Sequence, residues 1–541
     1  MEATTFSTQR LDHLGIVTGV CRHVQLIEQI DARLGPSERK VTVGEAVQAM
    51  VLNALGFASR ALYLTPQFFA NKPVDLLICE GLQAEDLNDD SLGRALDRLY
   101  ETGVTEVFAG VAAHALQIYG IQHHFVHLDS TSVSLQGEYA TASEDPRTVQ
   151  ITYGYSKDQR PDLKQAVVAL ICTYRSAIPV WLETLSGNSA DKTSFPKTIQ
   201  AYVTQLQSSE RPCFITDSAL YSADNLTALS AVSWITRVPE TIQEARDLLQ
   251  RLEPTAMQPS VLDGYRYCEV TSQYGGVPQR WLVVFSEQAY AREATTFQQQ
   301  VGRYQGQAQK QLWHLSHREF ATQEAARLAV TAMEKPWRFH RAEVQLAPVA
   351  HYGRRGRPRA EQTPQQVRWR VVGRVVEEPE AIAAALKSKG KFIVATNEGD
   401  VERLPAETML SAYKAQGSSV ERGFRFLKDP RFFADSLFLK RPERLMALLM
   451  VMGVALLVYA LAEHTVRTEL LHGRKSLPDQ RGKPTQQPTM RWIFQLFEGI
   501  DILWLQQPAG VQRLILNLKP VHRQILNLLG PEVRKCYSLD R

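Results

Sequence analysis

Three acidic side chains stand where a negative charge is costly unless another group compensates it. Asp129 ends the apolar run FVHLD and Asp217 ends the run CFITD, and small polar residues follow both. A carboxylate at the end of a buried strand loses hydration unless a cation or hydrogen-bond donors meet it. The alternative for either aspartate alone is a residue that caps the turn after its strand. Two such placements in one chain favour a metal site.

The third acid lies in the segment YKAQGSSVERGFRFLKDP at 413–430, within a helix that the pattern predicts over about 405–428. Glu421 and Lys428 are seven residues apart and nearly share a helix face, with Arg425 at the intermediate turn. An acid flanked by cations suits a site that holds a metal ion and a phosphate together. The alternative is an ion pair between Glu421 and Arg425 on a solvated surface.

The composition is that of a soluble globular protein with several folding units. The chain has 541 residues, of which 44% are hydrophobic and 22% charged. A net charge of +4 is too small to indicate a partner. The six cysteines include no C-x-x-C pair, and the N-terminal residues lack the pattern of a signal peptide. We therefore expect a protein of the reducing cytoplasm.

Hydrophobic periodicity divides the chain into five segments. Residues 123–238 predict an α/β domain, in which an antiparallel meander of three strands is followed by a helix that crosses over to a fourth strand ending at Asp217. The uncharged stretch 445–461 is just short of a membrane span, and we expect a buried core helix there. The other segments are a helical N-terminal domain at 1–122, a partly β insertion domain at 239–379, the remainder of the α/β domain at 380–475, and a C-terminal loop with helices at 476–541.

Several motifs occur along the chain at characteristic spacings, with 88 residues from Asp129 to Asp217 and 204 from Asp217 to Glu421. They are HLDSTSVSLQGEY around Asp129, GYSKDQRPDLKQ at 154–165, Gly187-Asn188 with Asp191, TDSALYSADNL around Asp217, WITRV at 234–238, YKAQGSSVERGFRFLK at 413–428 and PTMRWIFQLFEGI at 488–500. Together, these motifs resemble the DDE transposases of bacterial insertion sequences, in the branch with a partly β insertion between the second Asp and the Glu. The resemblance covers most of the chain.

The resemblance implies an RNase H-like catalytic core, interrupted by the insertion domain, that cleaves DNA with two Mg²⁺ ions, Mn²⁺ being an alternative. Asp129 would bridge the ions, Asp217 would hold one and Glu421 the other. Water would cut the DNA at each element end, and the freed 3′-hydroxyl would attack target DNA. The implied partners are double-stranded terminal inverted repeats, bound in part by the helical N-terminal domain, and target DNA. Because two ends are cut in concert, we expect a homodimer on DNA in the bacterial nucleoid.

Several basic and polar residues are implied to contact DNA. The family signature on the last helix includes an arginine that contacts phosphate. Gln416 stands near the position of this arginine, so Gln416 or Arg425 would share its phosphate contact. Residues 351–374 contain seven Arg and one Glu. Their RRGRPR run resembles an AT-hook, and the alternative is a basic turn that meets only phosphate or solvent. The implied DNA contacts are Tyr413, Gln416, Arg425, Lys428, Lys157, Arg160, Lys164, Arg355 and Arg357.

Two other functions remain open at the level of sequence. An RNase H-like nuclease would use the same three acids to cut nucleic acid without strand transfer. A DNA-binding protein descended from a transposase would have lost catalysis, although all three acids are present here.

Replacing Arg355 and Arg357 together with Ala tests the arginine-rich run. We expect an affinity loss of similar size on A·T-rich and G·C-rich duplexes and a salt slope reduced by up to about two units, because phosphate contacts carry no sequence information. Titrations on both duplexes at several salt concentrations measure this. A loss concentrated on A·T-rich DNA would instead indicate minor-groove contact.

Overall fold

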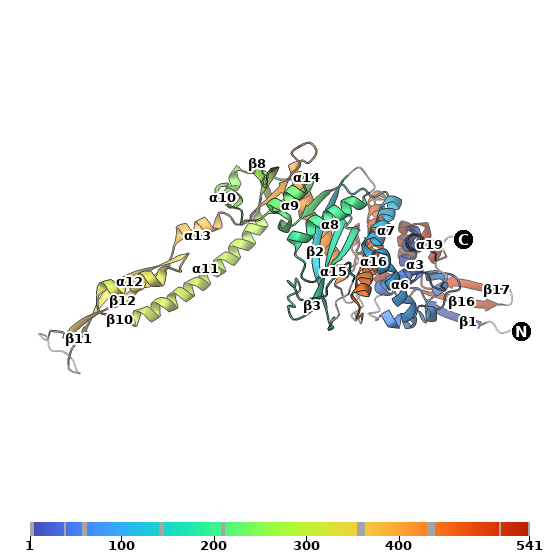
Figure 1. Ribbon diagram of the computed structural model, residues 1–541, viewed down its shortest axis with the longest axis horizontal. Coiled ribbons are helices and arrows are strands. Elements are labelled where there is room, and N and C mark those ends of the chain that lie inside the picture. The colour runs from blue at the N-terminus through green and yellow to red at the C-terminus, as the bar shows by residue number, and fades with distance from the viewer. Residues whose placement is uncertain are drawn as a thin grey trace. The chain divides into compact units, whose positions relative to one another are not determined.

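The protein is described by a computed structural model that covers residues 5–36, 39–56, 62–139, 145–206, 211–353, 363–429, 439–507 and 510–538. It forms two compact units (Figure 1), which are described separately below. Unit 1 comprises residues 1–236, 274–277 and 408–541, and unit 2 comprises 237–273 and 278–407. Both units are discontinuous in the chain.

The sheet of unit 1 has the strand order β4-β3-β2-β5-β6. The strands β2 (Phe125–Leu135), β3 (Lys164–Thr173) and β4 (Pro179–Leu185) form an antiparallel meander. Next to β2, the strands β5 (Cys213–Thr216) and β6 (Trp234–Val238) run parallel to it and to each other. Helix α8 (Asp191–Gln205) makes the crossover from β4 to β5. The predicted meander and crossover are thus confirmed.

Two helices from the C-terminal part of the chain pack on this sheet (Figure 1). Helix α15 (Val420–Leu427) packs against β2 and β3, and α16 (Pro442–His472) packs against β4. By length and composition α16 is able to span a membrane, but its most apolar 18-residue window is wholly buried within the protein. It is the core helix predicted at 445–461. Gly453 permits its approach to β4, because a Cβ there would lie 2.6 Å from Leu182 Cδ1.

A helical layer surrounds the other sides of α16, which packs against α1, α3, α6 and α7. These helices form because apolar residues recur every three to four positions and because polar residues cap their ends. The side chain of Thr42, for example, accepts a hydrogen bond from the Glu45 amide at the start of α3. The N-terminal helices are α1 (Leu14–His23), α2 (Leu26–Leu34), α3 (Val43–Leu55), α4 (Thr65–Phe69), α5 (Val74–Leu77), α6 (Asp89–Thr102) and α7 (Val104–Tyr119).

The prediction that residues 476–541 hold only loop and helices is wrong. Strand β16 (Asp501–Gln507) pairs antiparallel with β17 (Gly510–Ile515) and with the N-terminal strand β1 (Thr5–Arg10). Pairing with a segment at the opposite end of the chain leaves no local signal. The remaining C-terminal elements are β14 (Leu477–Pro478), β15 (Pro484–Thr485), α17 (Met490–Leu496), α18 (Pro520–Leu529) and α19 (Pro531–Cys536).

The single helix predicted over 405–428 is also wrong. The structure has α14 (Ala406–Lys414), a 3₁₀ turn (Ala415–Ser418) and then α15. Ser419 leaves helical geometry at φ −106° and ψ −99°, and its hydroxyl donates to the Thr173 carbonyl oxygen over 3.1 Å. Gly417 and the serines after it have low helix propensity, and this bond to β3 competes with helix continuation. Residue spacing across the break therefore does not follow a helical period.

Unit 2 combines two sheets with long helices. One set of strands has the order β13-β9-β8-β7, and a three-stranded sheet has the order β10-β12-β11. Leu312, Val330 and Val371 belong to a core between α11, α12 and the three-stranded sheet. The elements are β7 (Gln258–Pro259), β8 (Tyr265–Tyr274), β9 (Val277–Ser286), β10 (Glu319–Phe320), β11 (His340–His351), β12 (Gln366–Glu377), β13 (Lys391–Thr396), α10 (Gln243–Arg251), α11 (Glu287–Ser316), α12 (Gln323–Glu334) and α13 (Pro379–Leu386).

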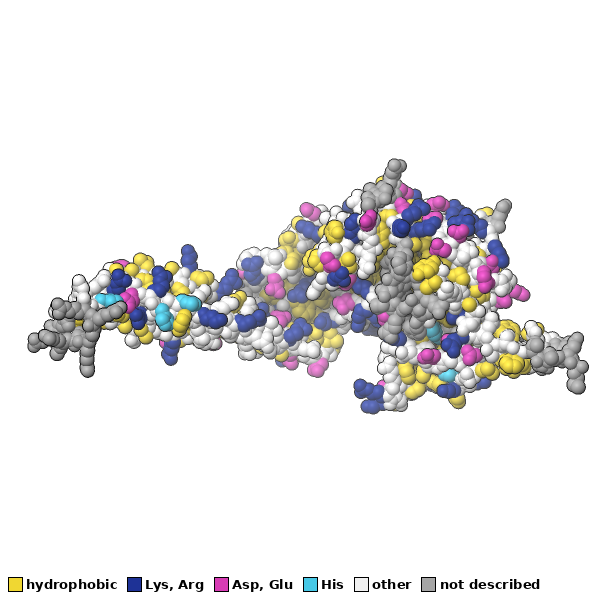
Figure 2. All heavy atoms as spheres, turned by 90° about the horizontal axis from the view of Figure 1, so that it is seen from below, with side chains coloured by type: hydrophobic (Ala, Val, Ile, Leu, Met, Phe, Trp, Pro, Cys, Tyr) yellow, Lys and Arg dark blue, Asp and Glu magenta, His cyan; other side chains and the backbone are white. Residues whose placement is uncertain are grey.

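Glutamates pair with two of the seven arginines counted at 351–374. Arg370 lies 2.8 Å from Glu319, and Arg374 lies 2.9 Å from Glu343. Figure 2 shows Lys and Arg side chains spread among uncharged and hydrophobic ones over the part of the chain that contains β11 and β12. The positive charge of residues 351–374 is therefore partly neutralised by Glu319 and Glu343, which lie outside that range.

A buried ion cluster ties α15 to α16. Glu463 on α16 has only 3% of its side chain exposed and accepts from Arg422 on α15, from Arg467 over 2.7 Å and from the Met490 amide over 2.9 Å. A buried carboxylate with this many donors is compensated for its lost hydration. The cluster thereby fixes the helix that carries Glu421.

Replacing Glu463 with Ala leaves the partly buried Arg422 and Arg467 without their shared carboxylate, which is itself only 3% exposed. We expect the free energy of unfolding to fall by about 3–5 kcal/mol, measured by denaturant titration followed by circular dichroism. The matched control is Glu532→Ala, which removes the Lys535–Glu532 pair, whose side chains are 54% and 29% exposed, and is expected to change stability by less than about 1 kcal/mol. Equal losses in the two variants would contradict the prediction.

Candidate metal centre

The parallel register of β2 and β5 brings Asp129 and Asp217 together. Phe125 pairs with Cys213 and His127 with Ile215, an offset that equals the 88-residue spacing of the two aspartates. Continuing this register by two residues places Asp217, directly after β5, beside Asp129 on β2. The sequence-predicted pair is therefore adjacent because the strands pair, as the apolar runs before each aspartate suggested.

A third carboxylate, from Asp191, completes the cluster. One oxygen of each of Asp129, Asp191 and Asp217 lies within 4.8 Å of the other two, and all three residues are partly buried. Asp191 is the first residue of α8, the crossover helix between β4 and β5. Asp191 belongs to the sequence motif that begins with Gly187-Asn188, but the sequence analysis does not predict it as a site residue.

Backbone and side-chain donors hold the two strand aspartates in place. Asp129 Oδ1 accepts from the Ser130 amide over 2.7 Å, and Asp217 Oδ1 accepts from the Ala219 amide over 2.9 Å. The main-chain oxygen of Asp217 accepts from the Thr236 hydroxyl over 2.6 Å. Each aspartate keeps carboxylate capacity beyond these bonds, since an ionised carboxylate accepts about four hydrogen bonds.

Lys157 supplies a positive charge within the cluster. Its Nζ lies 3.0 Å from Asp191 Oδ2 and 3.7 Å from Asp129 Oδ1. It also donates to the Ser130 carbonyl oxygen over 2.6 Å and to the Ser130 hydroxyl over 3.0 Å. Three carboxylates against one ammonium group leave an excess of negative charge, and oxygen donors of this kind are the ligands that Mg²⁺ and Mn²⁺ prefer.

Burial raises the pKa of both strand aspartates. Desolvation lifts the pKa of Asp129 from its ordinary value of 3.8 to about 6, with Lys157 acting in the opposite direction and Asp217 and Asp191 adding to the rise. The pKa of Asp217 is raised by the same cause, against the lowering effect of the Ala219 amide. Such shifts mark carboxylates that a nearby cation would stabilise in the ionised form.

Glu421 lies at the start of α15, exposed, and is not in the cluster formed by Asp129, Asp191 and Asp217. α15 itself packs against β2, the strand of Asp129. Tyr413 is on α14 and Gln416 is in the 3₁₀ turn, so both precede the helix break. Arg425, on α15, donates to the Gly417 carbonyl oxygen over 3.4 Å.

Three of the other predicted DNA contacts, Lys428, Arg160 and Lys164, lie in or near the loop at 156–162. Lys428 Nζ is 2.5 Å from Asp158, which joins this loop to the end of α15. Arg160 pairs with Asp162 over 2.7 Å, and both side chains are more than half exposed. Lys164, at the start of β3, donates to the Glu138 carbonyl oxygen. Arg355 and Arg357 fall outside the described residues.

Two glycines allow the Lys157 loop to approach the turn before Asp191. A Cβ on Gly154 would lie 2.0 Å from the Gly187 carbonyl oxygen, and a Cβ on Gly187 would lie 2.1 Å from the Gln165 carbonyl oxygen. Only glycine fits either position. The sequence signal available for Asp191 was the motif of Gly187-Asn188 with Asp191 on which the family resemblance partly rests.

His127 has a structural role. It is fully buried on β2, and its Nε2 is 2.8 Å from the Ala412 carbonyl oxygen. Burial lowers its pKa to about 4, so the ring is neutral at physiological pH. A buried neutral imidazole that bonds to the backbone positions α14 beside the strand of Asp129.

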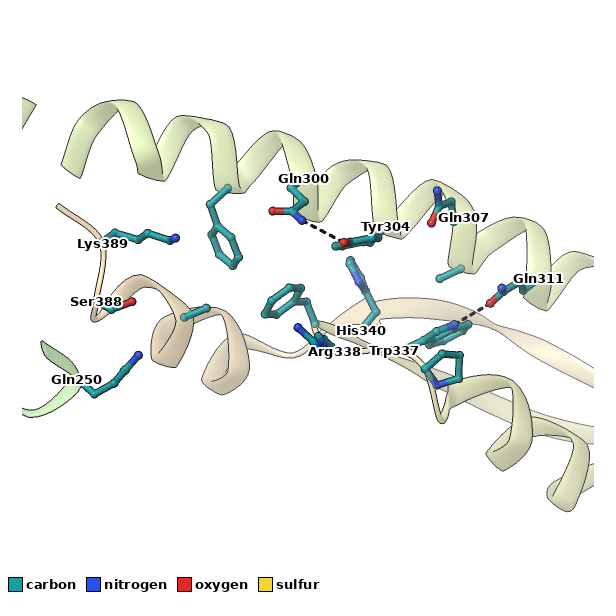
Figure 3. A pocket seen from close by; sticks show the side chains of 15 residues that line it. Gln250, Gln300, Tyr304, Gln307, Gln311, Trp337, Arg338, His340, Ser388 and Lys389 are labelled. Carbon is teal, nitrogen blue, oxygen red and sulfur yellow. Dashed lines mark hydrogen bonds between the residues drawn. The ribbon is translucent and has the colours of Figure 1, made fainter. Parts of the chain in front are cut away.

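Unit 2 contains a separate cavity of about 500 Å³ that has a different chemistry (Figure 3). One stripe of α11 lines it with Gln300, Tyr304, Gln307 and Gln311. Gln300 donates to Tyr304, and Trp337 on the opposite wall donates to Gln311 over 2.7 Å. The lining residues that the structure describes include no Asp or Glu. This cavity therefore offers no carboxylate to a metal ion.

Comparisons with known proteins cover the chain unevenly. Residues 6–113 match a family described as "Domain of unknown function (DUF4277)", which is less than half of the chain. No curated protein matches. Among solved structures, the chain is similar to a piggyBac transposase in a synaptic complex with hairpin DNA, with a TM-score of 0.35 and 8% identity over 91% of this chain and 82% of that one. At this score the similarity does not establish a shared fold.

Ionisation of Asp129 is expected to destabilise the protein in EDTA. Because its folded pKa of about 6 exceeds 3.8, the stability that it contributes is complete below about pH 3.8 and is lost as the pH rises through about 6. Asp129→Asn removes this titration. We expect the Tm of the variant, relative to the wild type, to increase between about pH 4 and 6 and then stay constant, in thermal unfolding at several pH values.

The matched control is Asp162→Asn. The Arg160 guanidinium lowers the pKa of Asp162 through a hydrogen bond, so this variant should show no such gain at higher pH. A Tm difference between Asp129→Asn and the wild type that does not vary with pH contradicts the assignment.

Proposed function

We propose that the protein is a DDE transposase that cuts the ends of a bacterial insertion sequence and joins them to target DNA. The observation that carries the proposal is the cluster of Asp129, Asp191 and Asp217, whose oxygens lie within 4.8 Å of one another where β5 ends beside β2. The resemblance of the sequence motifs to this family supplies the reaction class. The negative charge of the three carboxylates exceeds the positive charge of Lys157, the ammonium group that the structure describes beside them. Such an excess of carboxylate charge suits divalent cations.

The proposed ligands are Asp129, Asp217 and Glu421, on an RNase H-like core. Two Mg²⁺ ions, or Mn²⁺, when bound would activate an attacking oxygen and stabilise the leaving one. The exposed position of Glu421 on a short helix that packs on β2 suits a ligand that joins the other two only with DNA present. Glu463 would hold that helix in register through Arg422.

The chain's own cations would bind the DNA backbone beside the carboxylates. Lys157 lies within the cluster, Arg160 extends from the same loop, and Lys428 is tied to that loop through Asp158. Tyr413, Gln416, Arg425 and Lys164 are proposed as further contacts to the element end. Phosphate contacts of this kind position DNA without reading its sequence.

The proposed partners are terminal inverted repeats and target DNA, held by a homodimer in the bacterial cytoplasm. The helical N-terminal residues 1–122 are proposed to bind the element ends, and Arg355 and Arg357 to contact the DNA backbone. A nuclease that cuts without strand transfer would share the cluster, and the presence or absence of joined product distinguishes the two.

Three neutral substitutions test the proposal. We expect Asp129→Asn, Asp217→Asn and Glu421→Gln each to reduce Mg²⁺-dependent cleavage of terminal-repeat DNA by more than about 100-fold, beyond the range typical of residues that only support a ligand. DNA binding should persist, because the cationic contacts remain. Single-turnover cleavage and electrophoretic mobility shift assays measure the two effects.

Asp162→Asn is the control. Asp162 is exposed in the loop at 156–162, which also carries Lys157, and it pairs only with Arg160 among the interactions that the structure describes. Full cleavage by Asp129→Asn or Asp217→Asn would falsify the two-metal site. Full cleavage by Glu421→Gln alone would remove Glu421 from it. Cleaved but never joined DNA would favour the nuclease.

A further inference from the structure

We propose that Asp191 is a positioning residue that acts through Lys157, a role that rests on the proposed function. Asp191 draws the Lys157 ammonium group toward itself and so keeps the oxygens of Asp129 available to a divalent cation. The inference adds a fourth acidic residue, which the DDE assignment does not include, and gives it a different task from metal binding.

The distances define this task. Lys157 Nζ lies 3.0 Å from Asp191 and 3.7 Å from Asp129, so the shorter ion pair is the one with Asp191. The interaction of two charges weakens with distance and strengthens with burial, and both carboxylates are about four-fifths buried. Without the charge of Asp191, the closest anion to Lys157 is Asp129. The ammonium group would then compete with a metal ion for the same oxygens.

Asp191 is itself held by a second contact. The Ser130 hydroxyl donates to Asp191 Oδ1 and also accepts from Lys157 over 3.0 Å, so the three side chains form a closed set of hydrogen bonds. Ser130 directly follows Asp129 on β2. The arrangement therefore fixes the ammonium group relative to the metal-binding strand.

The backbone around Lys157 limits other positions for its side chain. The Lys157 amide donates to the Ser132 hydroxyl over 3.0 Å, and the close approach of Gly154 to Gly187 joins this loop to the turn before α8. Lys428 pairs with the neighbouring Asp158. With the loop held on both sides, removal of the Asp191 charge is expected to redirect the Lys157 side chain without moving the loop.

The test is a double-mutant cycle of Asp191→Asn and Lys157→Ala, read out as Mn²⁺ binding by isothermal titration calorimetry on the full chain without DNA. Asn preserves an oxygen for the Ser130 hydroxyl. We expect Asp191→Asn to weaken Mn²⁺ binding by ~10- to 100-fold in the wild-type background. In the Lys157→Ala background we expect a loss about tenfold smaller, because the competing ammonium group is gone.

A loss as large in the Lys157→Ala background as in the wild type would overturn the proposal, since Asp191 would then act on the metal directly. Unchanged Mn²⁺ binding by Asp191→Asn would also overturn it. Asp191→Glu retains the charge and is expected to bind Mn²⁺ more tightly than Asp191→Asn does. A loss in Asp191→Glu equal to that in Asp191→Asn would refute a role based on charge, and thermal unfolding verifies that each variant is folded.

Cleavage of terminal-repeat DNA separates this inference from the proposed function. If the wild type cleaves and Asp129→Asn does not, the proposed function stands, and Asp191→Asn with wild-type Mn²⁺ affinity and rate refutes only the role of Asp191. If the wild type binds Mn²⁺ but never cleaves, the proposed function fails, whereas the Mn²⁺ titrations still decide the role of Asp191. Asp162→Asn serves again as the matched control in the Lys157 loop.

Discussion

The parallel pairing of β2 with β5 is the constraint on which the candidate site depends. It sets an 88-residue offset between the strands, and this offset brings Asp129, within β2, beside Asp217, directly after the end of β5. Burial raises the pKa of Asp129, and repulsion from the neighbouring carboxylates of Asp217 and Asp191 adds to this rise. Lys157 and the hydrogen-bond donors around each carboxylate compensate the negative charge that is concentrated there.

Much of this sheet could be predicted because its strands are continuous apolar runs. Strands that are covered on both faces lack polar alternation, and β3, although antiparallel to its neighbours, is buried at every position after its first. The closeness of the first three runs, with a tight turn at residues 175–177 between the second and third, indicated an antiparallel meander. The helical segment before β5 indicated a crossover. Asp129 and Asp217 stood out as charges at the ends of such runs, so the pair was visible before the register was known.

Other features depended on contacts that no local pattern contains. Asp191 begins a helix, where an acid is ordinary, and only its pairing with Lys157 and Ser130 places it in the site. The helix break before Glu421 is stabilised by a bond from Ser419 to β3. Arg370 and Arg374 read as a basic patch because their glutamate partners lie outside the counted window. Strand β16 was missed because it pairs with the other end of the chain.

The pairing of β1 with β16 has a consequence for how the protein is made on the ribosome. Unit 1 needs residues from both ends of the chain, since α16 fills its core and β16 completes a sheet with β1. Contacts of such long sequence separation form slowly and only after both partners have been synthesised. A nascent chain that has just emerged through unit 2 thus has its strand aspartates but lacks the core helix behind them. Assembly of the carboxylate site on a complete core is therefore delayed until residues 442–472 have been synthesised.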